Sequence, residues 1–573
     1  MTENKTTVSA KTMDNAARRI SYQGLISLAG MDELKNTALT NLPKRLATHH
    51  YNGSYHIHDL EAFGVAPNCL TIDFQRSFPT DKLRSKNTLQ RLLGIFDYIR
   101  QAIVAIGGDQ SGGIGFANFD EDIAWACDQL AISDSRRTRQ ILRACIDNFI
   151  EWINTTRSRY GLECYYVTLN IGLSQSPLGK YSAVCLLDCL QNAPAGYIRP
   201  NIVFKTKAEL HFEKDARNRE LFDSALTTTA VRMIPTYLLC DATPNIDIPP
   251  EQLAIMGCRT RVAANLHGHT TAIGRGNLAY VSINLVQIAW KATQNHPQTK
   301  RIADFLSRWR TLAKDAAEIL LRRKQLLEKL PAQNFPGYCA IDPWMVPFAD
   351  SERIDAWKHG TLSIGFVGLA ESVDIMTQKK IGVDNDANIL ARRLVTAMRD
   401  EVDQLRSEHN CNFTLLATSA ESTSGRFARI DWANHRIPAA HKGFYTNSFH
   451  IPVDVPLNPI HKMQTEGPFH TMCNGGGISY VELGGPPLGN LLALEDMIQA
   501  ASSAGVSYFG VNFPKDICNN CGNQGVFDMC HSCDSTDVTH IRRVSGYLEA
   551  TTSFTSGKLA EIAKRTAHAR GGA

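Results

Sequence analysis

Four cysteines near the end of the chain have the spacing of a metal site. They occur as two CxxC pairs, Cys518 with Cys521 and Cys530 with Cys533, separated by residues 522–529. Each CxxC turn can place two thiolates on one side of an ion, and four thiolates suit tetrahedral Zn²⁺. Because such a closed shell has no open coordination position, the spacing predicts a structural zinc site rather than a catalytic one.

A single glycine follows this cluster in the string RRVSGYL at 542–548. One interpretation is a strand with a bulge or a turn at Gly546. The other interpretation is chemical. A radical at a glycine Cα is stabilised by the amide nitrogen on one side and the carbonyl on the other, and no side chain hinders a planar geometry. Gly546 is therefore a candidate radical position.

The string RRVSGYL, close behind the cysteine cluster, resembles the radical-bearing segment of the anaerobic, class III ribonucleoside-triphosphate reductases. Further stretches resemble the same family in the same order: YHIHDLE at 55–61, PNCL at 67–70, GDQSGGIGFANFD at 108–120, MGCRTRV at 256–262, GRGN at 274–277, SIGFVGLAE at 363–371, ATSAEST at 417–423 and YTNSFHIPV at 445–453. The resemblance implies an α/β fold, a ten-stranded barrel of the glycyl-radical type, with a helical N-terminal region and a small C-terminal zinc-binding domain.

The resemblance assigns catalytic roles to residues at matching positions. Cys258, at the tip of a finger loop inside the barrel, matches the cysteine whose thiyl radical abstracts the 3′ hydrogen of the ribose. Cys69 matches the cysteine on the opposite face of the substrate, and Glu421 matches a glutamate that accepts the 3′-OH proton. Asn277 is a candidate for the polar residue that orients formate, and Asn284 competes with it for this role.

Hydroxyl residues and a glycine are candidates for binding the triphosphate. Ser422, Thr423 and Ser424 stand at an expected helix start, where hydroxyls and free backbone N–H groups can hold phosphate. A simple helix cap explains the same residues almost as well. Gly476 allows a close backbone approach to substrate, or marks a plain loop.

The resemblance also implies cofactors and partners. A radical S-adenosylmethionine activase with an iron–sulfur cluster would generate the radical on Gly546. Ribonucleoside triphosphates are the expected substrates and dNTPs or ATP the effectors, with helices 86–106 and 140–156 as the candidate effector site at a homodimer interface. No cysteine lies between Cys258 and Asn284, which favours formate over a thioredoxin-like reductant. The ATP-cone of longer family members is expected to be absent.

The elements that must position these residues are alternating helices and strands. Apolar positions three or four apart predict helices over 14–49, 86–106, 120–159, 298–330 and 383–408. Short apolar runs between turn residues predict strands buried on both faces at 165–169, 201–204, 237–239, 280–285, 363–367 and 413–417. Both patterns indicate an α/β fold.

Three regions are expected along the chain. Residues 1–160 form a mainly helical region with the dimer and effector helices and the strand of Cys69. Residues 161–510 form the catalytic barrel around the finger loop of Cys258. Residues 511–573 hold the zinc site and the radical glycine.

Composition restricts the function classes. The 573 residues are 43% hydrophobic and carry a formal net charge of +4, so no strong field favours nucleic acid or membrane surfaces. No stretch reaches the roughly 18 apolar residues of a membrane span, and the first twenty residues lack the apolar segment of a signal peptide. Fifteen cysteines are an odd number, which favours metal-binding or catalytic thiols in a reducing cytoplasm over a disulfide framework.

Two other functions stay open beside the anaerobic reduction of ribonucleoside triphosphates with formate. Glycyl-radical enzymes of the pyruvate formate-lyase or diol-dehydratase type share the glycine and the thiyl cysteine, but lack the four-cysteine cluster beside the glycine. A zinc-ribbon interaction module is the non-enzymatic alternative. The aspartates around the cluster give such a ribbon no basic surface for nucleic acid.

Overall fold

The computed structural model describes residues 22–157, 164–349 and 354–568. Helices and strands alternate through most of these ranges. The strands are β1 (Tyr55–Ile57), β2 (Cys69–Ile72), β3 (Ile114–Phe116), β4 (Val167–Ile171), β5 (Asn201–Thr206), β6 (Thr236–Leu239), β7 (Arg275–Asn284), β8 (Thr361–Val367), β9 (Asn412–Ala417), β10 (Ser479–Glu482), β11 (Tyr508–Asn512), β12 (Lys515–Cys518), β13 (Gln524–Gly525), β14 (Val538–Arg543) and β15 (Leu548–Ala550).

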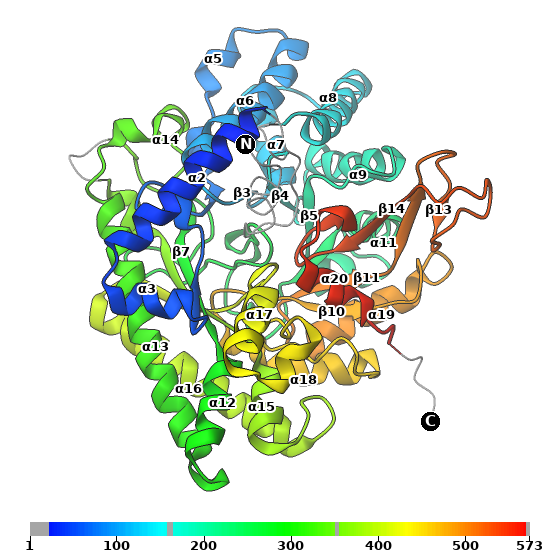
Figure 1. Cartoon of the computed structure of the whole chain (residues 1–573). Coiled ribbons are helices and arrows are strands. Elements are labelled where there is room, and N and C mark those ends of the chain that lie inside the picture. Colours follow the sequence, from blue (N-terminus) through cyan, green and yellow to red (C-terminus); the bar gives the residue numbers. More distant parts are fainter. Residues whose placement is uncertain (1–21, 158–163, 350–353, 569–573) are drawn as a thin grey trace.

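The α-helices of the described residues surround these strands (Figure 1). They are α2 (Tyr22–Asn41), α3 (Lys44–Tyr51), α4 (Phe74–Ser77), α5 (Thr80–Arg84), α6 (Thr88–Asp109), α7 (Phe119–Gln129), α8 (Arg136–Thr155), α9 (Pro177–Asn192), α10 (Ala208–His211), α11 (Arg219–Arg232), α12 (Leu285–Asn295), α13 (Gln298–Leu327), α14 (Pro336–Ile341), α15 (Leu369–Thr377), α16 (Asn385–His409), α17 (Thr423–His435), α18 (Pro459–Met472), α19 (Leu491–Ser503) and α20 (Ser556–Ala563).

One large sheet forms the centre of the molecule. Its strands run in the order β10-β11-β6-β5-β4-β3-β2-β7-β8-β9, and β1 pairs with β7 beside β2. Strands β2 to β6 are parallel to one another, as are β7 to β9 and the pair β10 and β11. The antiparallel pairs β2–β7 and β6–β11 join these three sets. Ala417 N–H donates to the Gly476 carbonyl, and Gly475 N–H donates to the Leu415 carbonyl. These bonds connect β9 to the segment before β10 and close the sheet into a barrel.

The barrel strands are buried on both faces. Every residue of β4, β5, β6, β8 and β9 is buried, because helices cover the outside and a loop between β6 and β7 fills the inside. Such strands need no alternation of apolar and polar residues, which agrees with the apolar runs in the sequence. The predicted α/β class is confirmed.

Two predicted helices are each divided. The prediction over 14–49 becomes α2 and α3, separated at Pro43, whose ring nitrogen has no N–H to donate; its residues 14–21 lie outside the described ranges. The prediction over 120–159 becomes α7 and α8, and its residues 158 and 159 also lie outside those ranges. The Ser135 side chain accepts a hydrogen bond from the Thr138 N–H and thereby caps the start of α8.

A second, four-stranded sheet follows the barrel in the order β13-β12-β14-β15. Strand β12 runs antiparallel to β14, with Cys518 opposite Val538. Gly546 lies in the turn between β14 and β15. In Figure 1 the arm with β13 projects from the edge of the molecule, whereas α20 lies against the body. The division at residue 160 remains a proposal, and the large sheet takes β1, β2 and β3 from the region before it.

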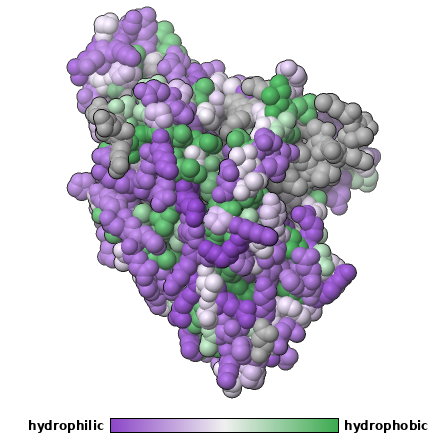
Figure 2. Space-filling view, turned by 60° about the vertical axis from the view of Figure 1, so that its left-hand side comes forward, coloured by the Kyte–Doolittle hydropathy of each residue, from purple (hydrophilic) through white to green (hydrophobic). Residues whose placement is uncertain are grey.

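The surface on the face of Figure 2 is mainly hydrophilic, with hydrophobic side chains in scattered groups. Among the described residues, none of the helices combines the length and the apolar character needed to cross a lipid bilayer.

Candidate active site

The loop between β6 and β7 carries Cys258 into the barrel. Asn170 on β4 holds this loop from both sides, since its amide donates to the Ile255 carbonyl at 3.0 Å and its side-chain oxygen accepts the Ile255 N–H at 2.9 Å. Thr168 donates to the Gly257 carbonyl at 3.4 Å. Gly257 has φ +57°, a left-handed conformation that glycine adopts without strain. The loop therefore turns at Gly257 and presents Cys258 at its tip.

The hairpin between β14 and β15 brings Gly546 against this tip. Val544 N–H donates to the Tyr547 carbonyl at 2.9 Å and closes the turn. A Cβ on Gly546 would lie 1.5 Å from the Cys258 carbonyl oxygen and 2.7 Å from the Cys258 Cα. Both atoms belong to the backbone and cannot rotate away, so the packing alone requires glycine at this position. The two residues expected to carry radicals are therefore in direct contact.

Glu421 joins the two elements. It lies in the turn between β9 and α17. Its Oε1 accepts hydrogen bonds from Ser545 Oγ at 2.9 Å and from Cys258 Sγ at 3.4 Å, and its Oε2 accepts one from the Tyr547 hydroxyl at 2.7 Å. Burial raises the pKa of Glu421, although these three donors oppose the shift. Burial and the Glu421 carboxylate also raise the pKa of Cys258, which keeps this sulfur as a neutral thiol.

Cys69 and Asn277 lie next to each other on paired strands. Cys69 begins β2 and stands opposite Asn277 on β7. Cys69 Sγ accepts the Gly113 N–H at 3.1 Å. The Asn277 amide forms hydrogen bonds with the Thr361 and Ser363 hydroxyls, each at 3.0 Å. Backbone pairing therefore fixes the position of the second thiol relative to the amide.

One cavity brings Cys69, Cys258 and Asn277 together. Glu421 is not among the residues that line it, but its carboxylate accepts hydrogen bonds from Cys258 and Tyr547, which do. Other lining residues include Asp59, Asn68, Cys164, Tyr166, Arg199, Arg259, Tyr280 and Ser419. The cavity thus places two thiols and an amide around one space, and the Glu421 carboxylate lies behind two of its lining residues.

The four residues considered for the triphosphate lie apart from this cavity. Ser422 precedes α17 and lines another cavity of about 1970 Å³, whereas Thr423 and Ser424 are buried at the start of the helix. Gly476 has φ +118°, and a Cβ there would lie 2.1 Å from the Arg259 carbonyl oxygen. Its contact is with the finger loop. Phosphate binding by these residues remains a prediction.

Arg199 is a site residue that the sequence did not reveal. It precedes β5, and its guanidinium donates to the Leu548 carbonyl at 3.0 Å and pairs with Glu549 at 2.9 Å. The same guanidinium lies 5.7 Å from the ring centre of Tyr166 and 5.3 Å from that of Tyr547. These contacts attach β15 to the barrel wall. No motif surrounds Arg199, so no local signal could have identified it.

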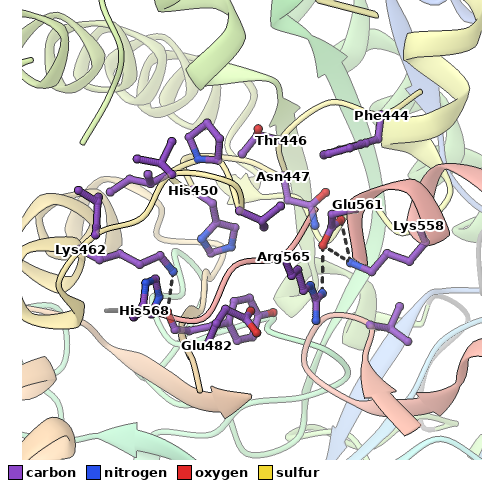
Figure 3. Close-up of a pocket in the computed structure, with 17 residues that line it drawn as sticks. Phe444, Thr446, Asn447, His450, Lys462, Glu482, Lys558, Glu561, Arg565 and His568 are labelled. Atoms are coloured by element: carbon purple, nitrogen blue, oxygen red, sulfur yellow. Dashed lines mark hydrogen bonds and ion pairs between the residues drawn. The ribbon is translucent and has the colours of Figure 1, made fainter. Parts of the chain in front are cut away.

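Helix α20 attaches the other side of the hairpin. Figure 3 shows Lys558 and Arg565 directed at Glu561, with distances of 2.9 and 3.0 Å. Burial would raise the pKa of Glu561, but the two cations outweigh burial and lower that pKa to about 2. Arg565 also donates to the Arg543 carbonyl at 3.0 Å. This buried charge cluster therefore holds β14, the strand that leads to Gly546.

The four cysteines of the C-terminal sheet converge as their spacing predicts. Their sulfurs lie within 4.8 Å of one another, with Cys518 and Cys533 at 3.5 Å and Cys521 and Cys530 at 3.6 Å. Zn–S bonds of about 2.3 Å give tetrahedral sulfur–sulfur edges of about 3.8 Å, so the arrangement fits zinc. The six residues of β14 span about 20 Å, which separates this group from Gly546 and agrees with a structural role.

Purified protein is expected to contain about one zinc ion per chain, measured by inductively coupled plasma mass spectrometry. Cys521→Ser should lower the zinc content sharply, because a hydroxyl replaces one thiolate ligand. Cys339→Ser is the matched control, since Cys339 is exposed and remote from the cluster, and it should keep the metal. Stoichiometric zinc in a Cys521→Ser, Cys533→Ser double variant would rule out this site.

Comparisons with known proteins agree with the geometry. The family model described as anaerobic ribonucleoside-triphosphate reductase matches residues 14–568. The enzyme of that name from Escherichia coli K12 is 28% identical over 92% of this chain and 79% of its own length. Its counterpart from Enterobacteria phage T4 is 26% identical over 93% of both chains.

Solved structures show the same fold at lower identity. The anaerobic ribonucleotide reductase of Thermotoga maritima, in complex with dATP and CTP, superposes with a TM-score of 0.69 at 14% identity and covers 93% of this chain and 89% of its own. Hydroxyproline dehydratase from Clostridioides difficile superposes with a TM-score of 0.60 at 12% identity over 93% of this chain and 84% of its own. Because the fold is shared with an enzyme of another substrate, it does not decide the substrate. The family match along almost the whole sequence does decide the family, and this chain belongs to the anaerobic ribonucleoside-triphosphate reductases.

Proposed function

We propose that this chain reduces ribonucleoside triphosphates to 2′-deoxyribonucleoside triphosphates by a radical relay from Gly546 to Cys258. The observation that carries the proposal is the contact between the Gly546 backbone and the Cys258 backbone, which leaves no room for a Cβ. Glu421 supports it, because this carboxylate binds Cys258 and both neighbours of Gly546. A hydrogen atom can pass between adjacent groups only when such packing holds them together.

In this proposal the Cys258 thiol gives its hydrogen atom to the Gly546 radical. The resulting thiyl removes the 3′ hydrogen of the ribose, and Glu421 accepts the 3′-OH proton as the neighbouring radical makes it acidic. The 2′-OH then takes up the proton that the overall reaction consumes and leaves as water. Cys69, across the cavity, supplies a hydrogen atom to the 2′ carbon. Formate then returns a hydrogen atom to the Cys69 sulfur and an electron to the 3′ ketone and leaves as CO₂, Glu421 returns its proton to the 3′ oxygen, and Cys258 returns a hydrogen atom to the 3′ carbon at the end of the cycle.

Formate is the proposed reductant. The balance is one ribonucleoside triphosphate, one formate and one proton giving one deoxyribonucleoside triphosphate, one CO₂ and one water. Asn277 supports this choice, since its amide lies beside Cys69 where a carboxylate would have to bind. Cys164 also lines the cavity, and its Sγ donates to the Asn154 carbonyl at 3.4 Å; the formate dependence of turnover therefore decides between formate and a thiol reductant.

Partners follow from the same proposal. A radical S-adenosylmethionine activase with an iron–sulfur cluster would form the Gly546 radical, because a closed zinc shell supplies no redox chemistry. Structures of the Thermotoga maritima reductase hold dATP in the specificity site, and we place dNTP or ATP effectors at α6 and α8 of a homodimer. Exposed Leu89, Leu93 and Val104 on α6 give that helix an apolar surface for a second copy.

Binding of the substrate triphosphate at Ser422, Thr423 and Ser424 is part of the proposal. The start of α17 follows Glu421 directly, so a nucleotide whose ribose reaches Glu421 has this helix start nearby. Backbone N–H groups at a helix start favour phosphate. Gly476 would contribute through the finger loop that it contacts.

An anaerobic assay with CTP, formate and a family activase tests the function. The expected result is dCTP formation that requires all three components, with CO₂ released from labelled formate in equal amount. Formation of dCTP without formate would show that formate is not the reductant. Absence of dCTP in the presence of a confirmed organic radical would refute the function as a whole.

Glu421→Gln is expected to lower kcat by about 100-fold or more, with a much smaller change in the affinity for CTP. The amide keeps a similar shape but cannot accept the 3′-OH proton, so the loss falls on the transition state. Steady-state kinetics and equilibrium binding of CTP separate the two effects. Ser545 can still donate a hydrogen bond to the glutamine oxygen in this variant, so the hairpin of Gly546 should keep its place. The yield of the Gly546 radical should therefore be unchanged, and it serves as the internal control. An unchanged kcat would remove Glu421 from the chemistry.

A further inference from the structure

Tyr166 lines the substrate cavity and carries a buried hydroxyl. The residue directly precedes β4 and lines the cavity that Cys69 and Cys258 share. Its hydroxyl is buried and has no hydrogen-bond partner among the described residues. The tyrosines around it are satisfied, since Tyr547 donates to Glu421 at 2.7 Å and Tyr508 shares a 2.7 Å hydrogen bond with Thr236. A buried hydroxyl without a partner is costly, and its persistence in a cavity points to a ligand that supplies one.

The ring of Tyr166 is fixed in place on several sides. A Cβ on Gly113 would lie 2.5 Å from its Cδ1, so the ring rests directly on the glycine whose N–H binds Cys69. The Tyr547 ring meets it edge-on at 5.1 Å, and Arg199 lies over its face. Burial raises the pKa of Tyr166 well above its ordinary value. The side chain is therefore a rigid, neutral O–H donor that packs on the glycine next to Cys69.

We propose that the Tyr166 hydroxyl donates a hydrogen bond to the 2′ oxygen of the bound ribonucleotide, an inference that rests on the proposed function. The two ribose hydroxyls need different partners in that reaction. The 3′-OH must lose a proton and needs an acceptor, which Glu421 provides. The 2′ oxygen must leave as water and needs a donor, and Tyr166 lies on the Cys69 side where that oxygen is expected.

This hydrogen bond would help the enzyme to distinguish substrate from product. A site with a buried donor binds an analogue that lacks the acceptor more weakly, because the donor is again left without a partner. The deoxyribonucleotide product lacks the 2′ oxygen. Tyr166 would therefore favour ribonucleotide binding and product release at the same time.

Binding of CTP and dCTP to the unactivated protein tests this inference, with dATP kept at saturation to occupy the effector site. The wild type should bind CTP about tenfold more tightly than dCTP. Tyr166→Phe removes only the hydroxyl and should bind both nucleotides alike. It should also be at least as heat-stable as the wild type without nucleotide, because it removes an unsatisfied group.

Tyr480→Phe is the matched control. The Tyr480 hydroxyl is also buried without a partner among the described residues, but it lines the cavity of Figure 3 rather than the substrate cavity. This variant should keep the preference for CTP. If Tyr166→Phe keeps it too, or melts at a clearly lower temperature, the inference is wrong. If the wild type binds CTP no better than it binds an unrelated nucleotide, the proposed function itself fails.

Discussion

Gly546→Ala is expected to yield no glycyl radical and no detectable dCTP. The added Cβ would lie 1.5 Å from the Cys258 carbonyl oxygen, and the finger loop behind it is held by Asn170 and by the Arg261 N–H, which donates to the Gly475 carbonyl. The finger loop cannot move away without breaking these hydrogen bonds, so the hairpin that carries residue 546 must withdraw from Cys258. Electron paramagnetic resonance after treatment with activase measures the radical, and product analysis measures turnover.

Gly489→Ala is the matched control for this variant. Gly489 lies in a loop where a Cβ would meet no atom within 4 Å, so radical yield and turnover should equal those of the wild type. A radical of normal yield in Gly546→Ala would mean that another residue carries it. Circular dichroism of both variants checks that the barrel remains folded.

Cys258→Ser should separate radical formation from catalysis. The activase should still produce the Gly546 radical, because the serine hydroxyl is small enough for the same space and can donate to Glu421 as the thiol does. Turnover should fall below detection, since an O–H bond is too strong for a glycyl radical to break. Radical spectroscopy and the dCTP assay on the same sample test both statements together.

Two further cysteine variants complete this experiment. Cys69→Ser should also lose dCTP formation, while Cys339→Ser, at an exposed position outside the cavity, should keep full activity. Retained turnover in Cys258→Ser would exclude Cys258 as the thiyl residue. Loss of activity in Cys339→Ser would mean that the assay reports general cysteine damage rather than the mechanism.

Much of the barrel could be predicted from the sequence because most of its parallel strands contain short apolar runs bounded by turn residues. The prediction for β7 began at Tyr280, whereas the strand begins at Arg275. Arg275 and Asn277 are polar yet buried, and the Arg275 guanidinium donates to the carbonyls of Ala263 and His359. Their polarity concealed the first half of the strand. Strands β1 and β3 have three residues each, too few for any periodicity.

In the candidate site, features within one short segment could be predicted from the sequence, whereas contacts between segments far apart in the chain could not. The cysteine spacing predicts the metal group, because all four ligands lie within one short segment. The motifs identified Cys69, Cys258, Glu421 and Gly546 one by one, but their mutual contacts depend on how the finger loop and the hairpin meet inside the barrel. Tyr166 carries no motif, and its importance comes from a missing hydrogen bond that only three-dimensional packing reveals.

The most direct test of the radical position is the mass of the chain after the activated protein meets air. Oxygen adds to a glycyl radical at its Cα, and the peroxyl product breaks the backbone there. Mass spectrometry should find a large fragment that ends near Ser545 and a C-terminal piece that begins near Gly546, while unactivated protein and Gly546→Ala stay whole. Cleavage at another residue, or an intact chain despite a confirmed organic radical, would contradict the assignment of Gly546 as the radical residue.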